Sequence, residues 1–142
     1  MDKLKLSTAN IVILAAGVVM FIASFLAFNK FSIGPFSRSY NAWSSGHFLI
    51  VTIPALLGVV MAAHVATVAY APAVHLPERI LGLSWNQIHL VLAFQATIMM
   101  LSFVIQDSPF GDKGIGMILM LIAAIALLVG AIMRMQESPR AV

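Results

Sequence analysis

Two histidines are the residues whose type and position point most directly to chemistry in this chain. At about 1.5 Å per helical residue, His64 lies about 9 Å before Tyr70 and His89 about 6 Å after Trp85. If these segments are neighbouring antiparallel helices, the two imidazoles lie at similar depth and within one helical turn of each other. Small helical bundles hold haem b between two such imidazoles. His64 and His89 are therefore candidate cofactor-binding residues for haem b.

A second interpretation needs no cofactor. A haem requires cationic partners for its propionates, and Arg79 is the basic residue that the nearby loop offers. Two histidines near the end of a bundle also serve as hydrogen-bonding groups between helices. We expect this structural role, with no cofactor, no metal site and no catalytic residue, and keep haem b as the alternative. The same pair could also hold a metal or relay protons.

The elements that must position these histidines are strongly apolar. Hydrophobic residues make up 61% of the 142 residues and charged residues 9%, whereas soluble domains are about 45–50% apolar. Four apolar stretches have the length of a bilayer-spanning helix, at about 10–29, 47–70, 85–106 and 115–134. We predict an all-α fold, a single membrane domain over 1–142 in which four transmembrane helices form an up-down-up-down bundle. The absence of cysteine excludes disulfides, thiolate metal sites and thiol catalysis.

The basic residues indicate orientation. Five lie in the two termini and the second loop, against three in the first and third loops. Those on the first side are Lys3, Lys5, Arg79, Arg134 and Arg140, and those on the second are Lys30, Arg38 and Lys113. By the positive-inside rule, we predict cytoplasmic termini and a multi-pass protein of the plasma membrane. Basic residues dispersed in this way form no nucleic-acid patch.

Small residues predict where the helices pack. Gly58 and Ala62 share one face of the second stretch, and Ala126 and Gly130 share one face of the fourth. Such rows let helix backbones approach closely in a membrane. In the third stretch, Gln95, Ser102 and Gln106 form a polar stripe that we expect to face protein and to hydrogen-bond between helices. In the second loop, Pro77-Glu78-Arg79 is expected to start a short helical turn at the interface.

Function is argued mainly from what the apolar stretches lack. They contain no aspartate, glutamate, lysine or arginine between their ends, whereas proton- or cation-coupled carriers normally need a charged residue there. We expect a non-enzymatic accessory or structural subunit, held laterally to a larger respiratory or cell-envelope complex, or to itself, by the small-residue seams. Its expected partners are the lipid bilayer and other membrane subunits. The alternatives are a bis-histidine haem b electron-transfer protein and a lipid or small-molecule binding or transport protein that uses the polar stripe.

Two short motifs carry a resemblance. Trp43-Ser44-Ser45-Gly46 precedes the second stretch, and Leu81-Gly82-Leu83-Ser84-Trp85 leads into the third. With its short basic start, four spans and arginine near the end, the chain resembles small, functionally uncharacterised four-helix integral membrane proteins of actinobacteria. The likeness covers most of the chain as an arrangement. It implies an actinobacterial plasma membrane, and it implies no reaction, substrate or site residue.

Overall fold

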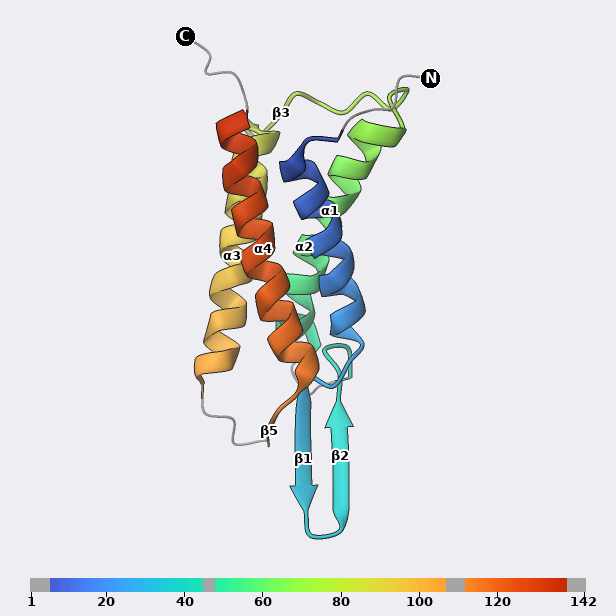
Figure 1. Ribbon diagram of the computed structural model, residues 1–142, viewed down its shortest axis with the longest axis vertical. Helices are drawn as coiled ribbons and strands as arrows, with labels where there is room; N and C mark the ends of the chain where they lie inside the picture. Colours follow the sequence, from blue (N-terminus) through green and yellow to red (C-terminus); the bar gives the residue numbers. More distant parts are fainter. Residues whose placement is uncertain (1–5, 45–47, 107–111, 138–142) are drawn as a thin grey trace.

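Four helices make up the body of the described part of the chain. The computed structural model describes residues 6–44, 48–106 and 112–137. The helices are α1 (Thr8–Ser24), α2 (Phe48–Tyr70), α3 (Trp85–Ile105) and α4 (Ile115–Glu137) (Figure 1). Three of them, α2, α3 and α4, are long and apolar enough to cross a membrane. The predicted helical, membrane-type fold is confirmed at this level.

The first helix is shorter than predicted. It has 17 residues, about 25 Å at 1.5 Å per residue, and ends at Ser24 rather than near 29. The apolar run continues to Phe28, but Phe28 is not helical: its amide donates to the Tyr40 carbonyl at 2.7 Å. Its ring is buried and packs edge-on against Phe103 at 5.7 Å between centroids. Burial in a loop therefore accounts for apolar residues that we had assigned to the helix.

A β-hairpin follows α1, where we predicted only a loop. The antiparallel strands β1 (Asn29–Ile33) and β2 (Phe36–Tyr40) extend beyond the helices (Figure 1). The short strand β5 (Asp112–Lys113) pairs with β1 on its other edge, giving the strand order β2-β1-β5. Gly34 turns the hairpin with φ +58°, a left-handed conformation that glycine adopts readily. Because β1 directly follows α1 and β5 directly precedes α4, the β1–β5 pairing holds the end of α1 close to the start of α4.

The loop between α2 and α3 contains a second small ladder. Strands β3 (Arg79–Ile80) and β4 (Leu83–Ser84) pair antiparallel across Leu81 and Gly82. Both turn residues have positive φ, 53° and 83°, as a type I′ hairpin turn requires. The predicted helical turn at Pro77-Glu78-Arg79 is therefore wrong, because the loop turns through Leu81-Gly82 instead. Ser84 then caps α3 in a reciprocal capping box with Gln87.

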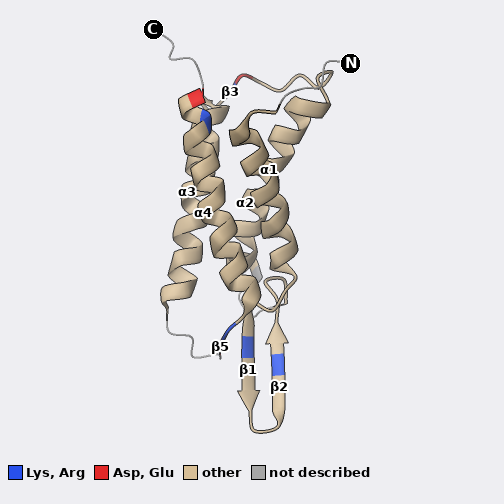
Figure 2. Cartoon of the chain, in the orientation of Figure 1, with Lys and Arg blue, Asp and Glu red and all other residues tan. Residues whose placement is uncertain are grey.

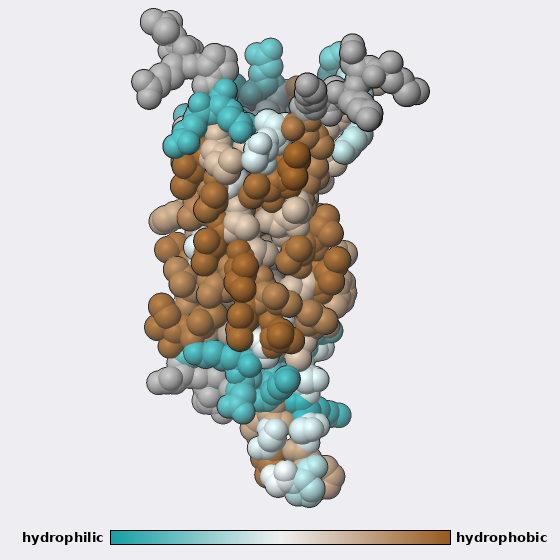
Figure 3. All heavy atoms as spheres, in the orientation of Figure 1, coloured by the Kyte–Doolittle hydropathy of each residue, from teal (hydrophilic) through white to brown (hydrophobic). Residues whose placement is uncertain are grey.

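Polar and apolar residues are segregated along the long axis. Figure 2 shows the charged residues of the described chain near the two ends of the bundle and on the strands. Figure 3 shows the apolar belt between them on the face in view, with hydrophilic residues above and below it. This pattern, an uncharged belt between two polar ends, is what a bilayer core requires of a helical bundle.

Close backbone contacts join α1 to its neighbours. A Cβ on Gly17 would lie 2.7 Å from the Ala62 Cβ and 2.7 Å from the Gly58 carbonyl oxygen, so α1 and α2 touch at these positions. Gly130 of α4 faces the Ile13 and Val12 side chains of α1. Ala126 lies half-buried on the same helix. The small residues that we had considered as seams for a partner thus lie at or near contacts between helices of this chain.

The α1–α2 contact gives a matched pair of substitutions. Gly17→Ala should lower the free energy of unfolding by about 1–3 kcal/mol, because the new methyl meets the Gly58 backbone, which cannot move alone. Gly58→Ala should cost less, because its methyl meets the flexible end of Met20 at 3.0 Å rather than a backbone atom. Unfolding in mixed micelles by denaturing detergent measures both. Equal losses would contradict the described packing.

Candidate functional site

The two candidate histidines are in direct contact. His64 from α2 and His89 from α3 lie 2.9 Å apart between the Nδ1 of His64 and the Nε2 of His89. Their ring centroids are 4.9 Å apart with the planes at 72°. Both side chains are buried, with 6% of His64 and 1% of His89 exposed. The similar depth inferred by counting residues along the two helices thus brings the imidazoles together.

An indole fixes the other face of His64. Trp85, the first residue of α3, stacks on His64 with 3.8 Å between ring centroids and 16° between planes. Its Nε1 donates a 2.7 Å hydrogen bond to the Pro77 carbonyl. The loop before α3 therefore holds the tryptophan, and the tryptophan and His89 together hold the His64 ring.

The pair does not fit a haem placed between the imidazoles. Metal–imidazole bonds are about 2.0–2.1 Å, so nitrogens on opposite sides of an iron lie about 4 Å apart, whereas these lie 2.9 Å apart. A porphyrin would have to occupy the space in which the rings touch, and Trp85 covers the remaining face of His64. The described residues also contain no group of three or more histidine, cysteine or acidic side chains able to hold a metal. What the arrangement supplies is a hydrogen bond between two helices.

This hydrogen bond leaves one nitrogen unsatisfied. The His89 Nδ1 is buried and has no hydrogen-bond partner among the described residues. In either tautomer of the pair, one ring nitrogen of His89 is thus desolvated without compensation, which costs free energy. The net contribution of the pair to stability is therefore smaller than the cost of removing one member of it.

A double-mutant cycle measures that difference. His64→Leu and His89→Leu should each lower the free energy of unfolding by about 1–2 kcal/mol, because each leaves a buried imidazole unpaired. The double variant should lose less than the sum, with a coupling of about 0.5–1.5 kcal/mol. His75→Leu, at an exposed loop position, is the control and should change little. Strict additivity would show that the histidines do not interact.

A second polar cluster lies at the same end of the bundle. Arg134 in the last turns of α4 donates from Nε to the Asn86 Oδ1 at 2.6 Å and from Nη1 to the Asn10 Oδ1 at 2.9 Å. One guanidinium thereby links α4 to α3 and to α1. The sequence analysis used Arg134 only as an orientation signal. Asparagines near the starts of two apolar stretches were the available signal for this contact.

The polar stripe of α3 faces outward. Gln95, Ser102 and Gln106 are all exposed, so the stripe takes no part in the interior of the bundle. On the side of α3 that faces α4, the buried Thr97 hydroxyl lies 2.8 Å from the Ala93 carbonyl of its own helix and 3.1 Å from the Ala124 carbonyl of α4. Among the described residues, the stripe therefore forms no hydrogen bond to a neighbouring helix of this chain, and that it faces protein stays a prediction. The physical reason is size: α3 packs through residues such as Ala93 and Ala96, which permit a closer approach than glutamine does.

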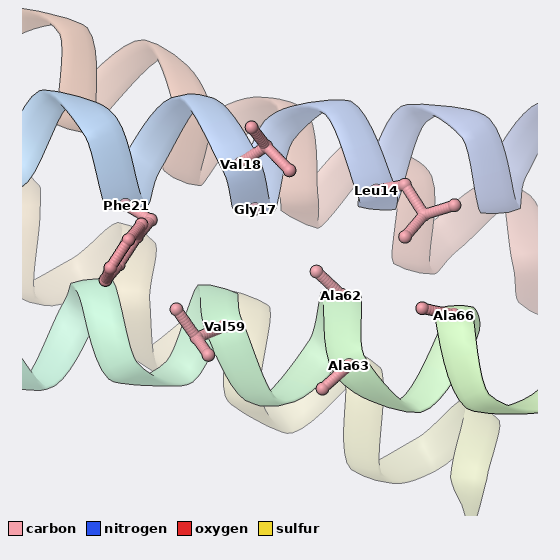
Figure 4. A pocket seen from close by; sticks show the side chains of 8 residues that line it. All are labelled: Leu14, Gly17, Val18, Phe21, Val59, Ala62, Ala63 and Ala66. Carbon is pink, nitrogen blue, oxygen red and sulfur yellow. The ribbon is translucent and has the colours of Figure 1, made fainter.

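A shallow apolar groove lies between α1 and α2 (Figure 4). Its volume is about 320 Å³. The lining residues are Leu14, Gly17, Val18, Phe21, Val59, Ala62, Ala63 and Ala66. None of these described lining residues has a polar side chain to orient a ligand, as specific small-molecule sites require. The groove is also formed by other helices than the one that carries Gln95, so it does not join the polar stripe in a common binding site.

No protein-family model, curated protein or solved structure matches this chain.

Proposed function

We propose that this chain is a non-enzymatic integral membrane subunit that works by lateral association with another membrane protein chain through the outer face of α3. The observation that carries the proposal is the exposed amide of Gln95. Gln95 is the middle residue of α3 (Trp85–Ile105). At about 1.5 Å per residue it lies about 15 Å from either end of the helix, which is the centre of a bilayer core about 30 Å thick.

An amide at this depth is costly when only lipid surrounds it. Transfer of an amide from water into an apolar medium without a hydrogen bond costs several kcal/mol. In membrane bundles, glutamine side chains relieve this cost by hydrogen-bonding across helices. Because Gln95 turns away from the other helices of its own chain, the partner that relieves it belongs to a different chain.

The buried share of each helix also favours the outer face of α3 as the contact surface. Only 28% of the apolar window of α3 is buried within the chain, against 44% for α2 and for α4. Of these three helices, α3 therefore has the largest share of its surface left for an outside contact. Its outward residues include large apolar side chains, Val91, Phe94 and Ile98, beside the Gln95 amide. Apolar packing around one central polar pair is typical of association between membrane helices.

The remaining features suit a subunit and favour no catalyst. The His64–His89 pair and the Arg134 cluster bond to side chains of this chain. The apolar groove brings no polar group to a substrate. We place the chain in the plasma membrane with both termini cytoplasmic, and α1 as a fourth span that local thinning of the bilayer accommodates. The larger assembly that it joins is a respiratory or a cell-envelope complex, or an assembly of its own copies.

Purification of the tagged protein from its native membranes in mild detergent tests the proposal. We expect a stoichiometric complex, with either a different membrane chain or further copies of this one. An absorbance spectrum of the same sample tests the haem alternative, and we expect no Soret band. A monodisperse monomer without a bound chain would contradict the proposed function, and a Soret band lost in His64→Ala would replace it with electron transfer.

A further inference from the structure

We infer that the chain on the outer face of α3 is a second copy of this protein, related to the first by a twofold axis along the membrane normal. The inference rests on the proposed function and names its partner. In such a dimer, the two α3 helices lie side by side and parallel, and the Gln95 amide of each copy bonds the Gln95 amide of the other.

The spacing of the outward residues fits a pair of parallel helices. Val91, Gln95, Ile98, Ser102 and Ile105 follow one another at intervals of four, three, four and three residues, and all are exposed. That alternation is the 3.5-residue repeat of a left-handed helix pair. Membrane helices most often cross in this left-handed way, at about 20°. The repeat runs over most of the length of α3, so the seam is continuous rather than a single contact.

The chemistry of the central residue fits a second copy. A glutamine amide has both donor and acceptor groups, so one glutamine can satisfy another in a reciprocal pair. Copies inserted in the membrane with the same orientation place Gln95 at the same depth. A twofold axis along the normal then brings each residue of the seam opposite itself. Every apolar position of the repeat, Val91, Ile98 and Ile105, thereby meets an identical apolar side chain.

The remainder of α3 does not oppose this contact. No charged residue occurs between Trp85 and Ile105, so two copies of the helix do not repel each other. The stripe residue Ser102 is small enough to let the backbones approach. A central amide such as that of Gln95, among mostly apolar positions, also fixes the register and number of helices in such a pair.

The chain has no cysteine, so single cysteines report contacts directly. Ile98→Cys is expected to give a disulfide-linked dimer when native membranes containing the full-length protein are oxidised. Ile122→Cys on α4 and Leu56→Cys on α2 lie at similar depth and are also exposed; they are controls that should remain monomeric. Equal cross-linking at all three positions would indicate random collision and would overturn the twofold pair.

Substitution of the amide tests its role. Gln95→Leu should weaken dimerisation about tenfold, measured by energy transfer between labelled copies as lipid dilutes them. Gln95→Asn should retain most of the affinity, because it keeps an amide at the same position. Both variants change an outward residue, and the free energy of unfolding of the separated chain should stay the same. Unchanged dimerisation in Gln95→Leu would overturn the amide pair.

The outcomes separate this inference from the proposed function. A dimer linked through Ile98→Cys supports both. No self-link at this position, with a different membrane chain bound there in stoichiometric amount, overturns the second copy and leaves the proposed function standing. Neither a self-link nor any bound chain overturns both.

Discussion

Arg134→Met is expected to lower the free energy of unfolding by about 2–4 kcal/mol. The guanidinium donates to the Oδ1 atoms of Asn10 and Asn86, and hydrogen bonds from a charged group contribute about 1.5–3 kcal/mol each. Methionine fills a similar length without donors, so both asparagines lose this partner. The loss should appear as separation of α4 from α1 and α3 at this end, measured by unfolding in mixed micelles.

Arg134→Lys is the matched control for charge. Lysine keeps the positive charge but cannot donate along the two directions of the guanidinium fork. We expect about half of the loss seen for Arg134→Met. Asn10→Ala and Asn86→Ala each remove one acceptor, and each should lower the free energy of unfolding by about as much as Arg134→Lys does. Full stability in Arg134→Lys would show that charge alone, and not the link between three helices, is what the arginine supplies.

Gly114→Ala is expected to destabilise the chain by about 3 kcal/mol. The Gly114 amide donates to the Phe28 carbonyl at 2.8 Å, and the Gly116 amide donates to the Ala27 carbonyl at 2.9 Å. A Cβ on Gly114 would run into the Ala27 carbonyl itself. Because the obstacles are backbone atoms of Ala27 and Phe28, the segment after α1 and the start of α4 must move apart, which places the loss at the upper end of the usual 1–3 kcal/mol for overpacking.

Gly34→Asn is the control at the tip of the hairpin. Gly34 has φ +58° and nothing within 4 Å of a Cβ, and asparagine tolerates this conformation better than most residues. It should change stability by less than about 0.5 kcal/mol. If Gly114→Ala changed stability as little as Gly34→Asn, the described contact between the start of α4 and residues 27–28 would be wrong.

The long helices were readable from sequence because apolar runs bounded by turn residues leave few alternatives. The stretch predicted over 85–106 is α3 (Trp85–Ile105), and the one predicted over 47–70 is α2 (Phe48–Tyr70). The hairpin after α1 was missed, although Lys30, Phe31, Ser32 and Ile33 alternate between polar and apolar before Gly34, the period of a strand. A hydropathy profile does not resolve such a short strand next to a much longer apolar stretch.

The candidate sites could also be predicted only in part. Depth along a helix follows from counting residues, so the approach of His64 and His89 could be anticipated. Rotation about the helix axis does not follow from counting, because in a membrane a polar stripe can face either another helix of the same chain or a different chain. Counting therefore did not show that Gln95, predicted to face protein, turns away from the other helices of its own chain, where its side chain is exposed.

The account rests most directly on whether protein covers the outer face of α3 in the membrane. A photo-reactive residue at position 98, with the same residue at position 122 as the depth-matched control, reports what lies beside each helix in intact native membranes. We predict a protein adduct of defined mass at 98, either this chain or one other, and lipid adducts at 122. Lipid adducts alone at both positions would contradict the account.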